Sequence, residues 1–469
     1  MNKSPLVYID FGGSRISAIA GFVQDDHALK VLGEQLRLSD DVKSGIVEKM
    51  TGAAFKVNEI TKLLQNSLKL EQISRVSISV NARTMKHYTY TLESQIFNLV
   101  TDKLLKDIEK KCKEDVENDK NYVFECIPLA YYIDGERVDN PTGKHGSNIR
   151  IDFNVIIGNY QVKESLERSI ERTGIAVDYI HLGIEAVSTA ILDDKNRDDG
   201  CAIIAFGATT TTLGVYCEGM LQELCVIPLG GMNITKDIQE LGVSFQNAEL
   251  LKCKTGCAME KMVTKPINVQ IPNENPHGEP VKISTLFLAT IIESRLEEML
   301  EPIFQQIDSI PYPLHSGIVI TGGAAKLKFL TEFIAEKTGF QVRIGNHTEW
   351  LSEDTDEKFF DPSYSQAVGA LLLSNELIQK QVEIQQAAIK PKLPNNFIKK
   401  MANKINIGME SLFKYDDMEK EQNKLGCMVA VRQKRNLLHA AATRRINRQL
   451  ERRTYQGMGQ NEPGSNSER

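Results

Sequence analysis

The sequence predicts an α/β protein built from two similar halves, and three observations favour this fold class. Strand-like apolar segments alternate with segments whose apolar residues recur at helical spacing. Two strand–turn–strand segments share one outline, "LVYIDFGGSRISAIAGFVQDD" at 6–26 and "CAIIAFGATTTTLGVYCEG" at 201–219. A third segment, "ITGGAAKLKFL" at 320–330, is the end of a strand that runs into a glycine pair.

Length and composition set the outer limits of the interpretation. A chain of 469 residues is too long for one hydrophobic core, so at least two domains are expected. The composition, 41% hydrophobic and 25% charged, is that of a soluble globular protein, and the net charge of −6 makes nucleic acid an unlikely partner of the whole chain. No secretory signal and no membrane-spanning apolar run are found. The eight scattered cysteines fit reduced thiols in a cytosol.

The first half begins with the hairpin over 5–23, and "LKVLGEQ" continues its sheet. The segment "AAFKVNEITKLLQNSLKL" has apolar residues at helical spacing, and "ISRVSISV" is a buried strand. Residues 84–157 then break this rhythm with a charged amphipathic helix, "TDKLLKDIEKKCKEDVEN", between polar β segments. We interpret 84–157 as an inserted subdomain.

The α/β rhythm resumes with "YQVKESLERSIERTGI" and "VDYIHLGIEAVSTAIL", followed by the second hairpin. The loop "NVQIPNENPHGEP" at 268–280 indicates a second insertion, and 284–307 is an amphipathic helix. Its residues predicted to pack on the lobe are Leu286, Ile291, Leu296, Leu300 and Phe304. The prolines at 391 and 394 mark a linker.

The candidate chemistry lies in the three glycine turns. Backbone amides of Gly12, Gly13 and Ser14 can approach an anion closely, and Asp10 can hold a hydrated Mg²⁺ against bound phosphates. The second hairpin offers Gly207, Thr209 and Thr210 in the same way, and the third turn places Gly322, Gly323 and Ala324 at a helix N-terminus. Any one of them alone is better explained as a plain tight turn. The set implies duplicated halves that close over one nucleotide.

At this point the order of motifs resembles that of the actin-like ATPases, and the details resemble the bacterial FtsA cell-division family. The hairpins resemble the two phosphate motifs, "GIVITGGAAKL" the adenosine motif, and "YSQAVGALLL" the helix that follows it. More specific to FtsA are "CIPLAYYIDGERVDNPTGKHGSNIRID", "VIPLGGMNITKDI" and "NAELLKCKTGCA". The resemblance covers residues 5 to about 375.

The resemblance implies a two-lobed actin-like fold, made of duplicated ribonuclease-H-like halves, with ATP and Mg²⁺ in the cleft. It divides the chain into a first lobe core (1–83 and 158–195), an inserted subdomain (84–157), a second lobe core (196–231 and 311–385), its outer subdomain (232–310), a linker (386–394), an amphipathic membrane helix (395–413) and a basic, partly disordered tail (414–469).

The same resemblance assigns roles to further residues. Glu249 and Lys252 match the acid and lysine that approach the ribose and base. Glu185 matches a position at which related proteins carry a water-positioning residue, which makes it the candidate catalytic residue. An ordinary acid near the start of a helix explains Glu185 equally well.

One expected acid is missing. In the second phosphate motif of the family an acid precedes the turn and helps to bind Mg²⁺, but here that position is Ala205, and Thr212 in the next strand offers no carboxylate. Backbone amides still cradle phosphate, whereas metal positioning and hydrolysis depend more on the carboxylate. We therefore expect a nucleotide binder with weak or absent hydrolysis, more a switch or scaffold than a turnover enzyme.

The tail is predicted to bind membrane. On a helix over 395–413 the apolar side includes Phe397, Ile398, Met401, Ile405, Leu412 and Phe413. Packing of this helix on the protein's own body is the alternative. In 432–453 eight Lys/Arg accompany one Glu, which indicates added attraction to anionic lipid, a solvated charged helix or, less favoured, nucleic-acid contact.

The function implied is that of a structural adaptor, peripheral on the cytoplasmic side of the membrane at the division site. The family tethers the FtsZ ring, assembles head to tail into filaments through the inserted subdomain, and works with other division proteins. The C-terminal peptide of FtsZ binds the outer subdomain, where Arg295 and Lys261 are the candidate cations here. The alternative is an actin-like ATPase of another role, such as a pilus-assembly relative.

Overall fold

The computed structural model describes residues 5–272 and 279–389. The predicted membrane helix at 395–413 and the basic tail at 414–469 therefore lie outside the described residues. The described chain up to Gln24 and from Leu29 to Asn375 forms one compact unit. The described part of a second unit consists of Asp25–Ala28 and the chain from Glu376 to Ile389.

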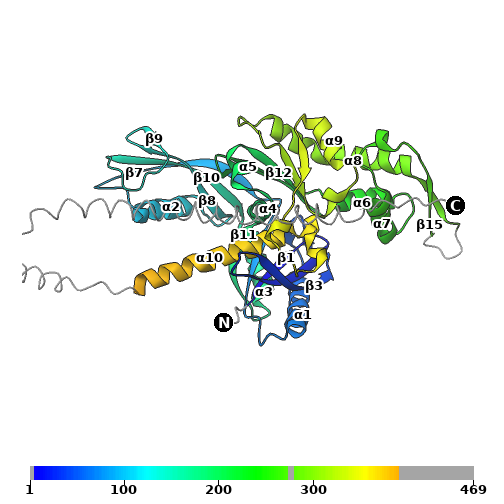
Figure 1. Cartoon of the computed structure of the whole chain (residues 1–469), viewed down its shortest axis with the longest axis horizontal. Helices are drawn as coiled ribbons and strands as arrows, with labels where there is room; N and C mark the ends of the chain where they lie inside the picture. The colour runs from blue at the N-terminus through cyan, green and yellow to red at the C-terminus, as the bar shows by residue number, and fades with distance from the viewer. Residues whose placement is uncertain (1–4, 273–278, 390–469) are drawn as a thin grey trace, which may run out of the picture. The chain divides into compact units, whose positions relative to one another are not determined.

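The first lobe is organised around a five-stranded sheet of order β11-β6-β1-β2-β3. Strands β1 and β2 form the predicted hairpin, β3 pairs antiparallel with β2, and β6 and β11 add parallel strands beyond β1. The elements of this lobe, several of which are labelled in Figure 1, are β1 (Leu6–Phe11), β2 (Arg15–Val23), β3 (Leu29–Leu38), β4 (Val42–Lys43), β5 (Ile46–Val47), α1 (Met50–Leu68), β6 (Arg75–Val80), α3 (Tyr160–Glu171), β11 (Ala176–Leu182), α4 (Gly183–Ile191) and α5 (Asp194–Asp198).

The second lobe repeats this topology in a sheet of order β14-β13-β12-β17-β18. Again an antiparallel hairpin is followed by a third antiparallel strand, and two parallel strands lie on its other side. Its core elements are β12 (Cys201–Phe206), β13 (Thr211–Cys217), β14 (Met220–Ile227), β17 (Ile318–Thr321), η2 (Gly323–Lys326), α9 (Leu330–Thr338), β18 (Val342–Ile344), η3 (Thr348–Trp350), η4 (Glu357–Phe360) and η5 (Pro362–Tyr364). The duplication predicted from the two hairpins is thus present in the whole sheet.

Strand β12 shows why its sequence is apolar without interruption. Cys201 and Ile203 pack into the core cluster of the first lobe, whereas Ala202, Ile204 and Phe206 pack into that of the second. A strand whose two faces are both buried carries apolar residues at every position. This burial places the turn that follows β12 next to the first lobe.

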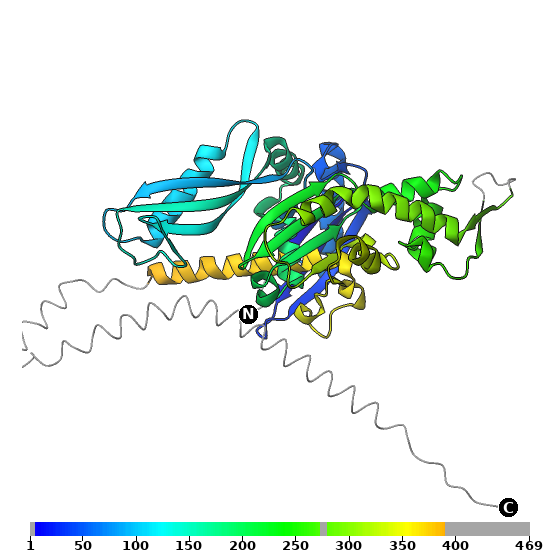
Figure 2. The ribbon, with the colours of Figure 1, turned by 90° about the horizontal axis from the view of Figure 1, so that it is seen from above.

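The inserted subdomain is a separate sheet of order β7-β10-β8-β9 with its own apolar cluster. Helix α2 lies across one face of this sheet, as Figure 2 shows from above. Asn154 of β10, which is buried, donates from Nδ2 to the carbonyl oxygens of Leu221 (2.9 Å) and Gln222 (3.1 Å) in β14, so the insert is attached to the second lobe as well. Its elements are β7 (Lys86–Gln95), α2 (Asp102–Val116), β8 (Asn121–Ile133), β9 (Glu136–Val138) and β10 (Asn148–Asn159).

The outer part of the second lobe is mainly helical, with a two-stranded hairpin. The predicted amphipathic helix is present as α8, but its buried stripe differs at the N-terminal end. Leu288 and Ile292 are buried there, while Leu286 and Ile291 are only half-buried. The run "LFLATII" is apolar at almost every position, so spacing alone does not fix which side packs. The elements are α6 (Gly231–Gln239), α7 (Phe245–Thr255), η1 (Glu260–Met262), β15 (Asn268–Ile271), β16 (Val281–Ser284) and α8 (Thr285–Asp308).

Helix α10 (Ser365–Ile389) extends beyond the predicted start of the linker at residue 386. Near its beginning α10 crosses α4 closely at Gly369. A Cβ at this position would lie only 1.7 Å from the carbonyl oxygen of Ala186 in α4. Among the described helices, none combines the length and apolarity needed to span a bilayer.

Candidate functional site

The two hairpin turns have the same local shape. In the first, a Cβ on Gly12 would lie 2.8 Å from the carbonyl oxygen of Arg15, and in the second a Cβ on Gly207 would lie 2.9 Å from that of Thr210. The amide of Gly207 donates to this Thr210 oxygen at 2.8 Å. Only glycine allows so close a return of the chain. Turns of this kind can present backbone amides to an anion.

The structure brings the two turns into direct contact. A Cβ on Gly13 would lie 2.0 Å from Oγ1 of Thr209, so the second turn touches the first where the first has no side chain. The backbone amide of Ser44 donates to the same Thr209 hydroxyl at 3.3 Å. Residues 12–14 and 207–210, far apart in sequence, are thus brought side by side.

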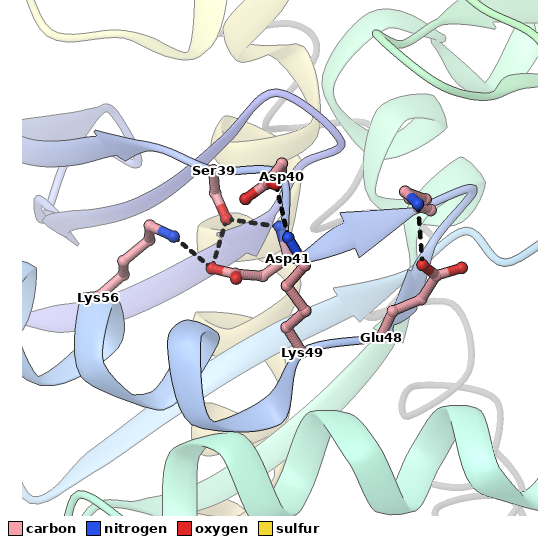
Figure 3. Close-up of polar contacts among 7 residues, drawn as sticks. Ser39, Asp40, Asp41, Glu48, Lys49 and Lys56 are labelled. Atoms are coloured by element: carbon pink, nitrogen blue, oxygen red, sulfur yellow. Dashed lines mark hydrogen bonds and ion pairs between the residues drawn. The ribbon is translucent and has the colours of Figure 1, made fainter.

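The segment that carries Ser44 is held by the cluster drawn in Figure 3. Asp41 is buried, and its carboxylate accepts a hydrogen bond from Oγ of Ser39 at 2.8 Å. The same carboxylate forms an ion pair with Lys56 of α1. The carbonyl oxygen of Asp41 accepts from the amides of Glu48 and Lys49. This cluster fixes the loop at the start of α1 and, through it, the amide that reaches Thr209. Sequence reasoning missed Ser44, although "KSG" before a helix is a turn signal.

Asp10 lies at the end of β1 in a network of polar side chains. Its Oδ1 accepts from Nε2 of Gln366 at 3.2 Å and from the hydroxyl of Tyr8 at 3.4 Å. Gln366 also donates to Ser79 at 2.8 Å and accepts from Asn81 at 2.7 Å. Burial raises the pKa of Asp10, while nearby Arg15 acts in the opposite direction. Gln366 was missed from the sequence, where the only signal is a polar residue near the start of the apolar helix α10.

Asp10 fits a hydrated Mg²⁺. Its Oδ1 is used by Gln366 and Tyr8, whereas Oδ2 lies beside the Gly12 turn, 3.3 Å from the position of a Cβ there. Mg²⁺ in nucleotide sites is commonly held by one or two carboxylates, phosphate oxygens and water. Asp10 would hold the ion through water, and the bound ion would shield the charge of the phosphates. A positive ion would also favour the ionised carboxylate that burial disfavours.

The position equivalent to Asp10 in the second lobe is Ala205. Asp10 pairs with Ser17 across the first hairpin, and Ala205 pairs with Thr212 across the second, so the two hairpins superpose in register as well as in sequence. On its other side Ala205 pairs with Thr321 of β17, whose hydroxyl contacts Ser365 at 2.9 Å. The strand ends around Ala205 therefore carry hydroxyl groups in place of a carboxylate.

The expected ribose and base side of the site is built around Gly231. Nζ of Lys252 donates to the carbonyl oxygen of Gly231 at 2.9 Å and to Oε2 of Glu249 at 2.7 Å. Burial works to raise the pKa of Glu249, but hydrogen bonds from Lys252 and Thr235 outweigh it and hold the pKa below its usual value. A Cβ on Gly231 would lie 3.2 Å from the Cβ of Ala324. Glu249, Lys252 and the third glycine turn are thus neighbours.

The third turn differs from its prediction in one respect. Gly322 (φ 92°) is followed by a 3₁₀ helix of four residues, η2, and the α-helix α9 begins only at Leu330. Gly322 is required because a Cβ there would lie 2.2 Å from the carbonyl oxygen of Phe206. At Gly323, in contrast, a Cβ would meet no described atom within 4 Å. The turn is anchored to β12 through Gly322 and is open at Gly323.

Glu185 lies in the first turn of α4, and its carboxyl group is hydrogen-bonded to Glu125 of the insert. Glu125 of β8 lies against it, and burial together with the charge of Glu185 and a hydrogen bond to it raises the pKa of Glu125. A protonated Glu125 that donates to Glu185 explains this pair. The described contacts therefore do not join Glu185 to the glycine turns, and a water-positioning role stays a prediction.

The two cations predicted for the partner peptide are already paired within the chain. Arg295 donates from Nη2 to Asp237 at 2.8 Å and from Nη1 to Glu298 at 2.6 Å, and Lys261 pairs with Glu336. A peptide carboxylate at either cation would have to compete with these acids.

Comparison with known proteins agrees with the motifs. Residues 202–369 match the family model described as cell division protein FtsA. Cell division protein FtsA of Escherichia coli (strain K12) is 26% identical over 396 residues, covering 80% of this chain and 91% of that protein. FtsA of Borreliella burgdorferi is 26% identical over 413 residues, covering 86% of this chain and 98% of that protein.

Solved structures show the same fold at lower identity. The PilM-PilN type IV pilus biogenesis complex gives a TM-score of 0.56 at 13% identity, covering 79% of this chain and 98% of the matched chain. MreB 5 of Spiroplasma citri bound to AMPPNP gives 0.50 at 11% identity, covering 82% of this chain and all of the other. The resemblance predicted from the glycine turns and the inserted subdomain is confirmed: the chain is similar to FtsA in sequence over most of its length, and it has the two-lobed actin-like fold.

Proposed function

We propose that this chain binds ATP with Mg²⁺ between its glycine turns and acts in cell division as an adaptor that joins the FtsZ ring to the membrane. The observation that carries the nucleotide part is the contact between Gly13 and Thr209. This contact brings two anion-binding turns of one shape together from opposite lobes, with Asp10 at the end of the first. The division role is supported by similarity to FtsA over 80% of the chain.

In this proposal the protein's own groups bind and orient the nucleotide. Amides of 12–14 and 207–210 donate to phosphate oxygens, and Lys252 with Glu249 contacts the ribose and base. Mg²⁺, when bound near Asp10, shields phosphate charge. Turnover is slow because Ala205 and its hydroxyl neighbours supply no second carboxylate to position the metal and water.

Titration calorimetry with ATP and Mg²⁺ tests the nucleotide part. We expect saturable binding and a hydrolysis rate far below the 1–10³ s⁻¹ of typical enzymes, on the order of minutes or slower per turnover. Gly323→Ala is the sharpest variant, because its methyl group meets no described atom and leaves the fold unstrained. Weaker ATP binding with an unchanged unfolding temperature would place the nucleotide beside Gly323. No heat of binding in the unmodified protein would refute the proposal.

Co-sedimentation with lipid vesicles tests the adaptor part. The full chain is expected to pellet with anionic vesicles and to carry a labelled FtsZ C-terminal peptide with it. A chain ending at residue 392 is expected to keep the peptide and lose the vesicles, because the predicted membrane helix is removed. Pelleting of the truncated chain would contradict the membrane assignment.

The peptide site is proposed on the outer part of the second lobe, 232–310. Since Arg295 is paired with Asp237 and Glu298, the charge-reversal variant Arg295→Glu also removes internal ion pairs. Lys261→Glu, at an exposed pair with Glu336, is the cleaner test. Fluorescence anisotropy of the peptide is expected to show a tenfold loss of affinity in the double variant, about 1.4 kcal/mol.

A pilus-assembly role is the second candidate. The PilM likeness, at 13% identity, concerns the fold, whereas the FtsA proteins match in sequence over most of their length. Binding of the FtsZ peptide distinguishes the two roles.

A further inference from the structure

Two cysteine thiols of the inserted subdomain lie in contact. Sγ of Cys126 on β8 lies 3.5 Å from Sγ of Cys112 on α2, with the Cys126 thiol directed toward the other sulfur. Cys112 has no exposed surface and Cys126 is 5% exposed. We propose that Cys112 and Cys126 form an intramolecular disulfide when the protein meets a small oxidant such as hydrogen peroxide, and that this bond ties α2 to the sheet of the insert.

The position of the two sulfurs favours this bond. A disulfide needs an S–S distance of about 2.05 Å, so the sulfurs have to approach by about 1.5 Å. Cys112 lies on the buried face of α2 with Ile108 and Val116, one turn away on either side, and this face packs on the sheet that contains Cys126. The cysteines are 14 residues apart and already on packed elements, so the approach requires no rearrangement of the fold.

Helix α2 has room for this movement. Beside its N-terminal half is a hollow of about 190 Å³, lined by residues that include Leu105 and Glu109 of the helix and Tyr131 and Phe153 of the sheet. The helix is therefore closely packed around Cys112 and Val116 and less so around Leu105. The hollow lets the N-terminal half of α2 shift as the two sulfurs approach, while the apolar contacts around Val116 persist.

The neighbouring groups define the order of the chemical steps. The hydrogen bond from Cys126 lowers the pKa of Cys112, while burial acts against it, and the same pairing raises the pKa of Cys126. The Cys112 thiolate attacks one peroxide oxygen and becomes a sulfenic acid, while the other oxygen leaves as water after protonation. The Cys126 sulfur then attacks the Cys112 sulfur, and the hydroxyl leaves as a second water. The two sulfurs lose two electrons, and one peroxide is reduced to two waters.

Burial also decides which product forms. A tripeptide thiol such as glutathione does not reach sulfurs that are at most 5% exposed, so mixed disulfides are disfavoured. Within the described residues, the structure records no contact between the sulfurs of any other pair of cysteines. The intramolecular bond is therefore the expected product at this pair.

Peptide mapping of the full-length protein tests the proposal directly. Trypsin cuts after Lys111, Lys113 and Lys120, so the two cysteines fall in separate peptides that only a disulfide holds together. After one molar equivalent of peroxide, alkylation and non-reducing digestion, we expect the linked pair. Under denaturing conditions the eight reactive thiols are expected to fall to six, and a reductant restores them.

Two cysteine variants distinguish the proposed disulfide between Cys112 and Cys126 from unspecific oxidation of thiols. Cys112→Ala is expected to abolish the linked peptide, while Cys225→Ser, at a half-buried thiol of β14, leaves it unchanged. Oxidation is expected to raise the unfolding temperature of the unmodified protein and of the Cys225 variant, but not that of the Cys112 variant. Because the mapping uses unmodified protein, it holds even if a variant fails to fold. Recovery of both peptides fully alkylated, with exposed Cys253 oxidised instead, would overturn the proposal.

Discussion

At position 13, a single methyl group is expected to separate the two turns of the site. Gly13→Ala places a Cβ 2.0 Å from Oγ1 of Thr209, so one turn has to move. We expect at least a tenfold loss of ATP affinity in calorimetry. Gly33→Ala is the matched control, because its Cβ meets its nearest neighbour, Leu68, at an ordinary 3.5 Å. Equal affinities of the two variants would argue against binding between the turns.

A variant at position 205 tests the explanation given for the slow ATP turnover that we propose. Ala205→Asp adds the carboxylate that the second hairpin lacks, at the position that corresponds to Asp10. Because two carboxylates hold Mg²⁺ better than one, ATP binding is expected to become more dependent on Mg²⁺. The measurement is ATP affinity as a function of free Mg²⁺, with Ala205→Asn as the uncharged control. A similar response in both variants would show that the carboxylate is not responsible.

At the scale of elements, the crossing of α4 and α10 depends on Gly369. Alanine usually stabilises a helix relative to glycine by about 1 kcal/mol, but here its Cβ would lie 1.7 Å from the backbone of Ala186. Forcing the helices apart is expected to cost roughly 1–3 kcal/mol, which exceeds that gain. Chemical denaturation of Gly369→Ala is expected to show lower stability, and Gln379→Ala, at an exposed position of the same helix, near-unchanged stability. Stabilisation by Gly369→Ala would contradict the close crossing.

How far the sequence predicts this molecule also depends on scale. The hairpins, the inserted subdomain and α8 can be predicted because the spacing of apolar residues and the positions of glycine turns are local properties of the sequence. The contact between Gly13 and Thr209, and the position of Gln366 beside Asp10, depend on how separate elements pack, which no local pattern records. Alternation of strands and helices likewise does not show that six residues separate Gly323, the second residue of the glycine pair, from Leu330, where α9 begins. Nor does it show that Arg295 is paired with Asp237.

For the whole molecule, buried His181 makes stability depend on pH. Burial lowers the pKa of His181 from 6.5 to about 4, and its Nε2 lies 2.8 Å from the hydroxyl of Ser374. Below pH 6.5 the His181 side chain is protonated in the unfolded chain but remains neutral in the folded chain. The free energy of unfolding therefore falls as the pH drops from 6.5 toward 4. The difference corresponds to about 3 kcal/mol at most. Denaturation of unmodified protein and His181→Gln at several pH values is expected to show a smaller loss in the variant, whereas parallel curves would exclude His181 as the cause.

The meeting of Gly13 with Thr209 also has a consequence for fragments of the chain. One turn belongs to the hairpin that begins at Leu6 and the other to the hairpin that begins at Cys201, so neither half alone contains a complete binding surface. Cleavage of the chain at the exposed residues Asp198 and Asp199 would yield two fragments, each with one of the two turns of the proposed ATP site. Because ATP would contact both turns, it would favour association of the two fragments, and the associated fraction would rise with the ATP concentration. The ligand proposed for the intact chain would thus promote the association of its two fragments.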